Sequence, residues 1–546
     1  MPLSKIKPRI TEAMSHNLPK QKRLSIPSTG QTLLGNARIW GSPILIAHQR
    51  LIDLLKQKVG LKDCFTVYHL DYDFLIYAYH KTNYQSLTFK LCAAALILNW
   101  IMGRTLGALS KDASLMDAEL WYRGDNESSQ PPISKVLDLL EQDFVLEPLR
   151  SLEYGSELVD ILPYAVEVFE TSEELLEAFG YERKSKKNSG IYYTPSDLSD
   201  YIVQQVYNLF HTSQPNRFPT WLDPACGTGI FLRSAFYCVI DNNLQEDASE
   251  YLFNNLFGID ISPIALQSAA YCLILAYAHN GSTELQTPKL ALESIGSHLV
   301  VCDSTTIQDC RKLSSLLPSL SNGADCVVSN PPYIRKSIVQ TGQLSLFDIS
   351  NSPSQTTSQA IYTDFVRMLD LLSDQSDGLG GIVIPLSIAY SSRREFQQLR
   401  QFLSIGGRIW RFAHFDRTPD SLFGDDVKTR CTIVLLERSQ QKFYYTTHLM
   451  RWSSRSRYKL FDGIRFAKVC TSVPICGIPK IGSDFEVTLL ELIAENCMGS
   501  LGDTIRRTKS LSLDIMRYLR SSRTAYNWLP LNCYRNTLLI MGIVIG

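Results

Sequence analysis

The sequence predicts an α/β protein whose central region is a doubly wound, Rossmann-like sheet. From about residue 190 onward, short apolar segments alternate with longer segments of helical periodicity, as in strands joined by crossover helices. Four of the apolar segments lead into a polar residue, namely Asp223, Asp260, Asp303 and Asn330. Because ligands bind at the carboxyl ends of strands in such sheets, we expect a functional site where these four side chains meet.

Composition restricts the class of protein. With 546 residues the chain is too long for one hydrophobic core, and 45% hydrophobic and 20% charged residues are typical of a soluble protein. Its 13 cysteines include no C-x-x-C pair, which favours reduced thiols in the cytoplasm and no metal site. The N-terminus has no apolar signal core, and the longest apolar run, residues 91–102, is too short to cross a bilayer. We therefore expect a cytoplasmic protein that is not bound to a membrane.

The N-terminal region, residues 1–187, is predicted to be a mostly helical domain. It begins with a basic arm that extends to about residue 35. Segments of helical apolar periodicity follow, for example residues 91–109 and 134–144. The basic run at residues 183–187 marks a linker to the next domain.

The central domain, residues 188–440, is predicted to contain the sheet. Strands are expected in its short apolar segments, at residues 221–223, 256–260, 299–303, 324–329, 381–385, 409–414 and 431–436. Crossover helices are expected where apolar residues recur with helical spacing, at residues 230–239, 263–278 and 362–372. The stretch 341–359 is rich in Ser, Gln and Thr and poor in apolar residues, which predicts a mobile loop.

The C-terminal region, residues 441–546, is the most basic part of the chain. It holds 15 Lys and Arg against 7 Asp and Glu, an excess of eight, and the rest of the chain balances this charge to a net of zero. Such an excess suits a surface that follows nucleic-acid phosphates. A solvated basic face without a partner would have the same composition.

A glycine turn, Asp223-Pro224-Ala225-Cys226-Gly227-Thr228-Gly229, follows the first strand. Glycine lets the backbone approach a ligand closely, and the spacing differs from the G-x-G-x-x-G of dinucleotide-binding proteins. The next two strands end in Asp260 and Asp303, where carboxylates can accept hydrogen bonds from ribose hydroxyls and from an adenine amino group. Any one of these acids is more simply explained as a helix cap. Three successive strands that end in Asp together predict a nucleoside cofactor.

The motif Asn330-Pro331-Pro332-Tyr333 closes the fourth strand. Its two prolines fix the backbone and remove two N–H donors, which leaves carbonyl groups directed into the cleft. The Asn330 side-chain oxygen and the Pro331 carbonyl can both accept from an exocyclic amino group, which localises the nitrogen lone pair for attack on a methyl group. Tyr333 offers a ring face to a base. The motif therefore predicts methylation of a planar amine or amide nitrogen.

These motifs resemble those of the N6-adenine-specific DNA methyltransferases of restriction-modification systems, in the gamma motif order and of the Eco57I type, over about residues 188–440. The resemblance implies a Rossmann-like methyltransferase core that binds S-adenosylmethionine through Tyr193, Thr194, Pro195, Asp223, Pro224, Ala225, Cys226, Gly227, Gly229, Asp260, Ile261 and Asp303. It implies that Asn330, Pro331, Pro332 and Tyr333 are catalytic. The target adenine would leave the duplex and lie between Tyr333 and Phe423.

The resemblance also implies partners. Double-stranded DNA is the expected substrate, and a cognate restriction endonuclease or a specificity subunit is the expected further partner. In the gamma order a target-recognition domain follows the catalytic domain, and residues 441–546 are short for a complete one. A fused nuclease would need a PD…(D/E)-x-K site in residues 1–180, and no convincing one is present.

Three alternatives remain open from the sequence. The chain could be a catalytically weak or silent DNA-binding subunit that retains the fold, for which the shortened recognition region argues. It could also be an RNA methyltransferase or a methyltransferase that acts on protein glutamine, because these enzymes use the same Asn-Pro-Pro-Tyr motif.

Overall fold

The computed structural model describes most of the chain between residues 30 and 495. The described residues are 30–59, 64, 84–110, 138–140, 143–150, 152–169, 194–243, 248–279, 294–338, 357–423, 429–475 and 477–495. The predicted basic arm, the linker at 183–187 and the basic residues from 496 onward lie outside these ranges.

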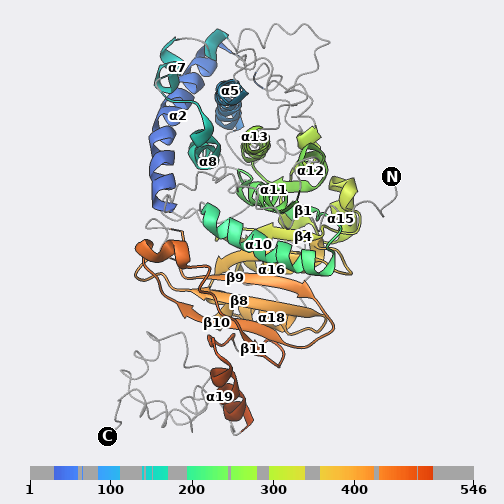
Figure 1. Ribbon diagram of the computed structural model, residues 1–546. Helices are drawn as coiled ribbons and strands as arrows, with labels where there is room; N and C mark the ends of the chain where they lie inside the picture. Colours follow the sequence, from blue (N-terminus) through green and yellow to red (C-terminus); the bar gives the residue numbers. More distant parts are fainter. Residues whose placement is uncertain are drawn as a thin grey trace, which may run out of the picture.

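A nine-stranded sheet forms the centre of the protein, with strand order β11-β10-β8-β9-β7-β4-β1-β2-β3 (Figure 1). Strand β9 runs antiparallel to β7 and β8, β11 runs antiparallel to β10, and the other neighbours are parallel. The strands are β1 (Trp221–Asp223), β2 (Leu256–Asp260), β3 (Leu299–Val301), β4 (Cys326–Ser329), β7 (Leu379–Pro385), β8 (Arg408–Phe415), β9 (Cys431–Arg438), β10 (Tyr444–Met450) and β11 (Ala467–Val469). The predicted α/β class is confirmed.

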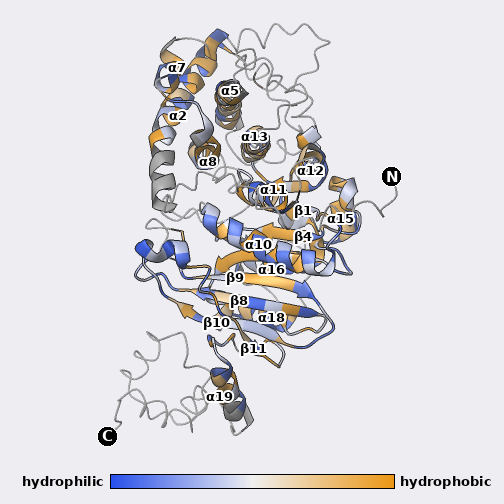
Figure 2. Ribbon diagram, in the orientation of Figure 1, coloured by the Kyte–Doolittle hydropathy of each residue, from blue (hydrophilic) through white to orange (hydrophobic). Residues whose placement is uncertain are grey.

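Helices cover both faces of the sheet, because successive residues of a strand point to opposite sides. Trp221 and Leu222 are both fully buried, yet they lie in separate hydrophobic clusters, one on each face. One face is covered by α10 (Ser196–Ser213), α11 (Ile230–Asn243), α12 (Ala248–Asn254) and α13 (Pro263–His279). The other is covered by α15 (Cys310–Leu316), α16 (Tyr362–Leu372), α17 (Ser387–Tyr390) and α18 (Arg394–Leu403). In Figure 2 the central strands are accordingly hydrophobic, whereas α10 carries both hydrophobic and hydrophilic residues along its length.

The N-terminal helices share a continuous core with the first of these faces. They lie beyond α13 in Figure 1 and comprise α2 (Gly30–Lys58), α5 (Tyr84–Ser110), α7 (Asp143–Arg150), α8 (Ser156–Ala165) and the short η4 (Val166–Phe169). Polar contacts tie them to the sheet layer. The Gln267 side chain donates to Asn99 Oδ1 at 2.8 Å, and Arg233 Nη1 donates to the Val159 carbonyl at 2.9 Å. The boundary predicted at residue 187 therefore does not separate two independent cores within the described residues.

Helix α5 is the one described helix that is long and apolar enough to cross a membrane, over Ser86–Leu109. Inside the protein 89% of that window is buried. A helix that is apolar on all sides and surrounded by other elements has the character of a core helix.

Several element boundaries differ from the predicted ones. Strand β3 ends at Val301, because the Asp303 side chain instead caps the short helix η5 (Ser304–Thr306). The predicted loop 341–359 is wrong at its end, because β6 (Thr357–Ala360) pairs with β5 (Arg335–Ile338) as an antiparallel ladder. Of that loop, residues 341–356 lie outside the described ranges, as do 134–137 and 141–142 of the helix predicted at 134–144.

The sheet continues past the domain boundary predicted at residue 440, through β10 and β11. The chain after β11 also packs on this sheet layer: Ile478 is fully buried and its N–H donates to the Ala389 carbonyl at 2.9 Å. The remaining elements of the described chain are η6 (Pro318–Leu320), η7 (Ser454–Lys459) and α19 (Asp484–Glu495). A truncation at residue 441 would therefore remove two strands of the sheet.

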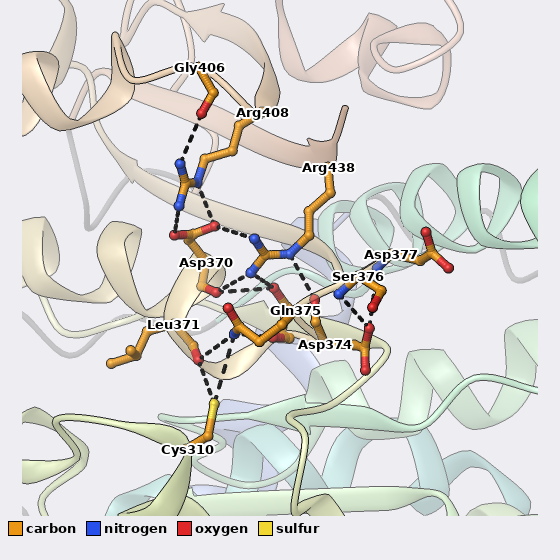
Figure 3. A network of polar contacts seen from close by, with 11 residues as sticks. Cys310, Asp370, Leu371, Asp374, Gln375, Ser376, Asp377, Gly406, Arg408 and Arg438 are labelled. Carbon is orange, nitrogen blue, oxygen red and sulfur yellow. Dashed lines mark hydrogen bonds and ion pairs between the residues drawn. The ribbon is translucent and has the colours of Figure 1, made fainter. Parts of the chain in front are cut away.

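An ion-pair network joins α16, β8 and β9 at the edge of the sheet where β7 and β8 begin (Figure 3). Asp370 lies between two arginines: it accepts from Arg408 Nε at 2.5 Å and lies 3.1 Å from Arg438 Nη1. All three side chains are at least four-fifths buried. This edge is opposite the one at which Asp223, Asp260 and Asn330 lie, because β7 and β8 run parallel in direction to β4.

Candidate active site

The predicted site residues follow four neighbouring parallel strands, β3, β2, β1 and β4. The strands are in close register: Asp223 pairs with Gly258 and Leu222 pairs with Val327. The carboxyl ends of the strands therefore meet at one edge, as predicted. This edge brings together the glycine turn, Asp260 and the motif that begins at Asn330.

Asp223 shapes the glycine turn from inside the protein. It is 1% exposed, and its Oδ1 accepts from the Ala225 N–H at 3.0 Å. Burial raises the pKa of this carboxyl to about 7, with a further increase from the Asp260 charge, although the hydrogen bond from Ala225 opposes the shift. The Cys226 N–H donates to the Ile259 carbonyl at 3.0 Å, and the Ser304 hydroxyl donates to the Pro224 carbonyl, so the turn is tied to β2 and to the helix η5 that follows β3.

The two glycines of the turn have different roles. Both have positive φ, +51° at Gly227 and +81° at Gly229, which side chains rarely adopt. A Cβ on Gly229 would lie 2.9 Å from Ala269 Cβ, so this glycine permits close packing of the turn on α13. A Cβ on Gly227 would meet no atom within 4 Å. The backbone at Gly227 thus borders open space at the edge where a cofactor is predicted.

Asp260 lies beside Gly227 and is partly exposed. Its Oδ2 accepts from the Gly227 N–H at 2.9 Å and its Oδ1 accepts from the Ser262 N–H at 2.8 Å. Burial raises the pKa of this carboxyl, although the N–H groups of Ser262, Gly227 and Ile261 oppose the shift. Because it is held by the glycine turn, the carboxylate is fixed at the mouth of the site. Ile261 follows it and is packed against both hydrophobic clusters.

Asp303 has the capping role that its sequence position also allowed. Its Oδ1 accepts from the Thr305 N–H at 3.0 Å and from the Thr305 hydroxyl at 2.7 Å. Lys336 Nζ lies 3.7 Å from its Oδ2, and the side chain is 9% exposed. A contact from Asp303 to an adenine ring stays a prediction.

Thr194 links the cofactor side of the site to the catalytic motif. The Asn330 Nδ2 donates to Thr194 Oγ1 at 2.9 Å, and the Tyr164 hydroxyl donates to the Thr194 carbonyl at 3.0 Å. Pro195 then caps the start of α10, while Tyr193 lies outside the described residues. The sequence did not indicate that Thr194 contacts Asn330. In this arrangement the Asn330 amide nitrogen donates to the Thr194 hydroxyl, and Oδ1 is the acceptor atom of the amide.

Tyr333 lies half-buried among aromatic rings at the end of the motif. Its hydroxyl donates to the Val383 carbonyl at 3.1 Å. Its ring centroid is 6.0 Å from those of Phe423 and Tyr362, with interplanar angles of 83° and 73°. Phe423 is 4% exposed. The two rings predicted to sandwich a base thus meet edge to face in this conformation, which leaves no room for a base between them.

Arg457 holds the segment that carries Phe423, a role that residue type and spacing did not indicate. Its guanidinium pairs with both carboxylate oxygens of Asp197, through Nε at 2.6 Å and Nη2 at 2.8 Å, and Nη1 donates to the Leu422 carbonyl at 2.9 Å. Asp197 lies in the first turn of α10, three residues after Thr194. One buried arginine from beyond residue 440 therefore joins the start of α10 to the residue before Phe423.

No group of three or more His, Cys, Asp or Glu within the described ranges is arranged to hold a metal ion. The polar and aromatic groups described at the edge are carboxylates, the Asn330 amide, backbone carbonyls and aromatic rings. These groups suit a nucleoside and a planar amino group.

Residues 254–421 match the family described as Eco57I restriction-modification methylase. Among solved structures, the DrdV–DNA complex determined by cryo-EM is similar, with a TM-score of 0.52 and 15% sequence identity, over 84% of this chain and 47% of that one. A nuclease-deletion mutant of the Type ISP restriction-modification enzyme LlaGI, in complex with a DNA substrate mimic, gives a TM-score of 0.48 and 15% identity, over 85% and 39%. A modification subunit of a putative type I restriction enzyme from Vibrio vulnificus YJ016 gives a TM-score of 0.42 and 13% sequence identity, over 85% of this chain and 98% of that one.

At these identities the likeness to DrdV bears on the fold alone. The chain spans less than half the length of DrdV and of LlaGI. The described sheet has the mostly parallel, doubly wound arrangement with helices on both faces, and residues 254–421, which contain Asp260 and Asn330, match the family model of the restriction-modification methylases.

Proposed function

Because residues 254–421 match the restriction-modification methylase family, we propose that the chain transfers the methyl group of S-adenosylmethionine to the N6 amino group of adenine in a specific sequence of double-stranded DNA. The observation that carries the proposal is the position of Asn330. It lies at the carboxyl end of β4, next to the strand that leads into the glycine turn, and Thr194 orients its amide. We further propose that the protein acts in the cytoplasm, away from membranes, with a restriction endonuclease or a specificity subunit as its partner.

The cofactor would lie against the open backbone at Gly227, with the Asp260 carboxylate beside its ribose hydroxyls. A fixed carboxylate and a glycine without a neighbour on its Cβ side suit a nucleoside that approaches the backbone closely. When bound, S-adenosylmethionine supplies an electrophilic methyl group. Asp223 would act indirectly in this arrangement, because it is buried beneath the turn that it stabilises.

The chain's own contribution to the reaction would be positioning and electrostatic stabilisation. The Oδ1 atom of Asn330 and the Pro331 carbonyl would accept the two N–H bonds of the target amino group. Positive charge that develops on the nitrogen would then face two carbonyl oxygens. The water-poor edge strengthens these contacts, since Pro331 is buried and Asn330 is mostly buried.

The proposal is tested by incubating the protein with plasmid DNA and S-adenosylmethionine and analysing the digested DNA by mass spectrometry. We expect N6-methyladenine as the product. Methylated cytosine, or methyl transfer only to RNA or to protein glutamine, would replace the proposed substrate with one of the alternatives. Cofactor binding without any methyl transfer would identify a silent subunit.

Replacing Asp260 by Ala should weaken binding of S-adenosylmethionine by about 1.5–3 kcal/mol, because a charge-assisted contact to the ribose is lost. Isothermal titration calorimetry without DNA measures the effect. Asp377→Ala is the matched control, because Asp377 is an exposed carboxylate before β7, at the opposite edge of the sheet. Equal affinities of the wild type and Asp260→Ala would refute the ribose assignment.

Tyr333→Ala and Phe423→Ala should each reduce the retention of a flipped base, with a loss of roughly 1–3 kcal/mol of stacking for each ring. The Phe423 ring must turn from its present edge-to-face position to stack on a base. Fluorescence of 2-aminopurine at the target position measures the flipped state. If Phe423→Ala lowers thermal stability without changing this fluorescence, Phe423 is a core residue and the sandwich prediction is wrong.

A further inference from the structure

A second pair of arginines bridged by an aspartate lies at the carboxyl edge of the sheet. Asp416 follows β8 and is 1% exposed. Its Oδ1 accepts from Arg430 Nε at 2.7 Å, and its Oδ2 accepts from Arg451 Nε at 2.8 Å. Burial alone would raise the pKa of this carboxyl, but the hydrogen bonds from Arg430, Arg451 and the Arg417 N–H outweigh it and lower the pKa. The carboxylate is thus ionised and holds both guanidinium groups in place.

The two arginines bridged by Asp416, Arg430 and Arg451, are called the Asp416 pair below. They lie at the same edge of the sheet as the candidate active site. Phe415, at the end of β8, pairs with Cys431 of β9, which in turn pairs with Pro385 at the end of β7. Strand β7 is parallel to β4, which leads into Asn330. The loop from β8 to β9 carries Phe423, whose ring contacts Tyr333. The arginines therefore lie along the rim that begins at the predicted base-binding residues.

The network at the opposite edge shows what a structural arginine pair looks like in this protein (Figure 3). There, Arg408 uses Nε and Nη2 on Asp370, and its Nη1 donates to the Gly406 carbonyl at 3.2 Å. Arg438 donates from Nε to the Asp374 carbonyl at 2.7 Å and from Nη2 to the Asp370 carbonyl at 2.6 Å. Their side chains are 18% and 12% exposed. Every nitrogen of these two arginines is engaged within the protein.

The Asp416 pair differs in the atoms it uses and in its exposure. The hydrogen bonds that Arg430 and Arg451 make to described residues use Nε alone. Their side chains are 33% and 69% exposed. The same bridging geometry thus holds two arginine side chains that are more exposed than those at Asp370, and these two lie at the edge that carries the candidate site. Held arginines of this kind lose little side-chain entropy when they bind a phosphate through two Nη donors.

We propose that Arg430 and Arg451 bind backbone phosphates of the nucleic-acid strand next to the target base, and that Asp416 presents them. The proposal rests on the proposed function and adds to it a phosphate site on the described sheet, separate from the basic residues after 495. Arg455 and Lys459, both exposed, extend the positive surface after Arg451, and the neutral ring of Tyr458 beside them is 74% exposed. Phosphate contacts would position the duplex, whereas base contacts would select the sequence.

The test is a fluorescence-anisotropy titration of a labelled DNA duplex of mixed sequence at several salt concentrations, with the full-length protein. The variants are Arg451→Gln and the double variant Arg430→Gln/Arg451→Gln. The matched control is Arg217→Gln, because Arg217 is 51% exposed and pairs with Asp325, before β4, at the opposite edge. Each variant removes one positive charge per substitution from a partly exposed arginine beside a carboxylate.

The slope of log affinity against log salt should become shallower by about 0.9 for Arg451→Gln and by about twice that for the double variant. Arg217→Gln should keep the wild-type slope. If Arg451→Gln and Arg217→Gln give equal slopes, the phosphate assignment is wrong, even where the wild type produces N6-methyladenine. If the slopes change as expected while no methylated adenine forms, the phosphate site stands and the proposed function fails.

Discussion

Replacing Asn330 by Ala should reduce methyl transfer by about 10² or more, by analogy with the loss of one preorganised transition-state contact. Binding of S-adenosylmethionine should stay close to the wild-type value, because Gly227 and Asp260 lie on other strand ends and do not depend on the Asn330 side chain. The rate is measured under single-turnover conditions, with the protein and the cofactor in excess over DNA, and cofactor binding is measured by calorimetry. This combination separates a defect in chemistry from a defect in the fold.

Two further variants define which part of the Asn330 amide matters. Asn330→Asp keeps an acceptor oxygen, and the Thr194 hydroxyl can rotate to donate to it. We therefore expect Asn330→Asp to retain more activity than Asn330→Ala. Thr194→Val removes the partner that orients the amide and should lower the rate while Asn330 remains in place. If Asn330→Ala keeps the wild-type rate, the motif at the end of β4 is structural and the catalytic assignment is wrong.

Replacing Asp370 by Ala should lower the free energy of unfolding by about 3–5 kcal/mol, because it leaves two arginines without their shared carboxylate in a largely buried position. Asp370 joins α16 to the start of β8 and to the end of β9, so its loss weakens the contacts between three elements at once. Urea unfolding followed by circular dichroism measures the change. Cofactor affinity of the folded protein should be unaffected, because the network lies at the opposite edge from Asp260.

Asp377→Ala is the control for this variant. Asp377 lies in the same region of Figure 3 but is exposed, and its one described side-chain contact is with Gln214 at 3.4 Å. An exposed substitution of this kind should change stability by less than about 0.5 kcal/mol. If Asp370→Ala and Asp377→Ala unfold at the same urea concentration, the Asp370 network contributes no more than a surface ion pair.

Local sequence patterns predicted much of the arrangement of the candidate site. The alternation of apolar and polar segments predicted β1, β2 and β7 to within a few residues, since strand periodicity is a local property. The parallel order then placed Asp223, Asp260 and Asn330 at one edge, because ligand-facing residues follow strands in such sheets. Glycines at positive φ were likewise indicated by residue type alone.

The sequence could not distinguish which polar residue contacts which partner. Asp223 ends a strand as Asp260 does and Asp303 follows one, yet Asp223 is buried beneath the turn and Asp303 caps a helix. The extent of the sheet was also misjudged at residue 440, because β10 pairs with β8 across an intervening crossover. Local periodicity does not show whether a strand is the last one in its sheet.

Only the tertiary structure decided the contacts between distant segments. The pairing of Arg457 with Asp197 spans 260 residues, that of Asn330 with Thr194 spans 136, and the Asp416 pair brings together the ends of three strands. The sequence shows that an arginine is charged but not which carboxylate it pairs with, because the chain has 54 Lys and Arg and 54 Asp and Glu. Residue type and local spacing therefore determined the fold class and the edge of the sheet at which the candidate residues lie. The partner of each charged side chain, and with it the difference between the buried pair at Asp370 and the exposed pair at Asp416, depends on the packing of strands and helices that bring distant residues within hydrogen-bonding distance.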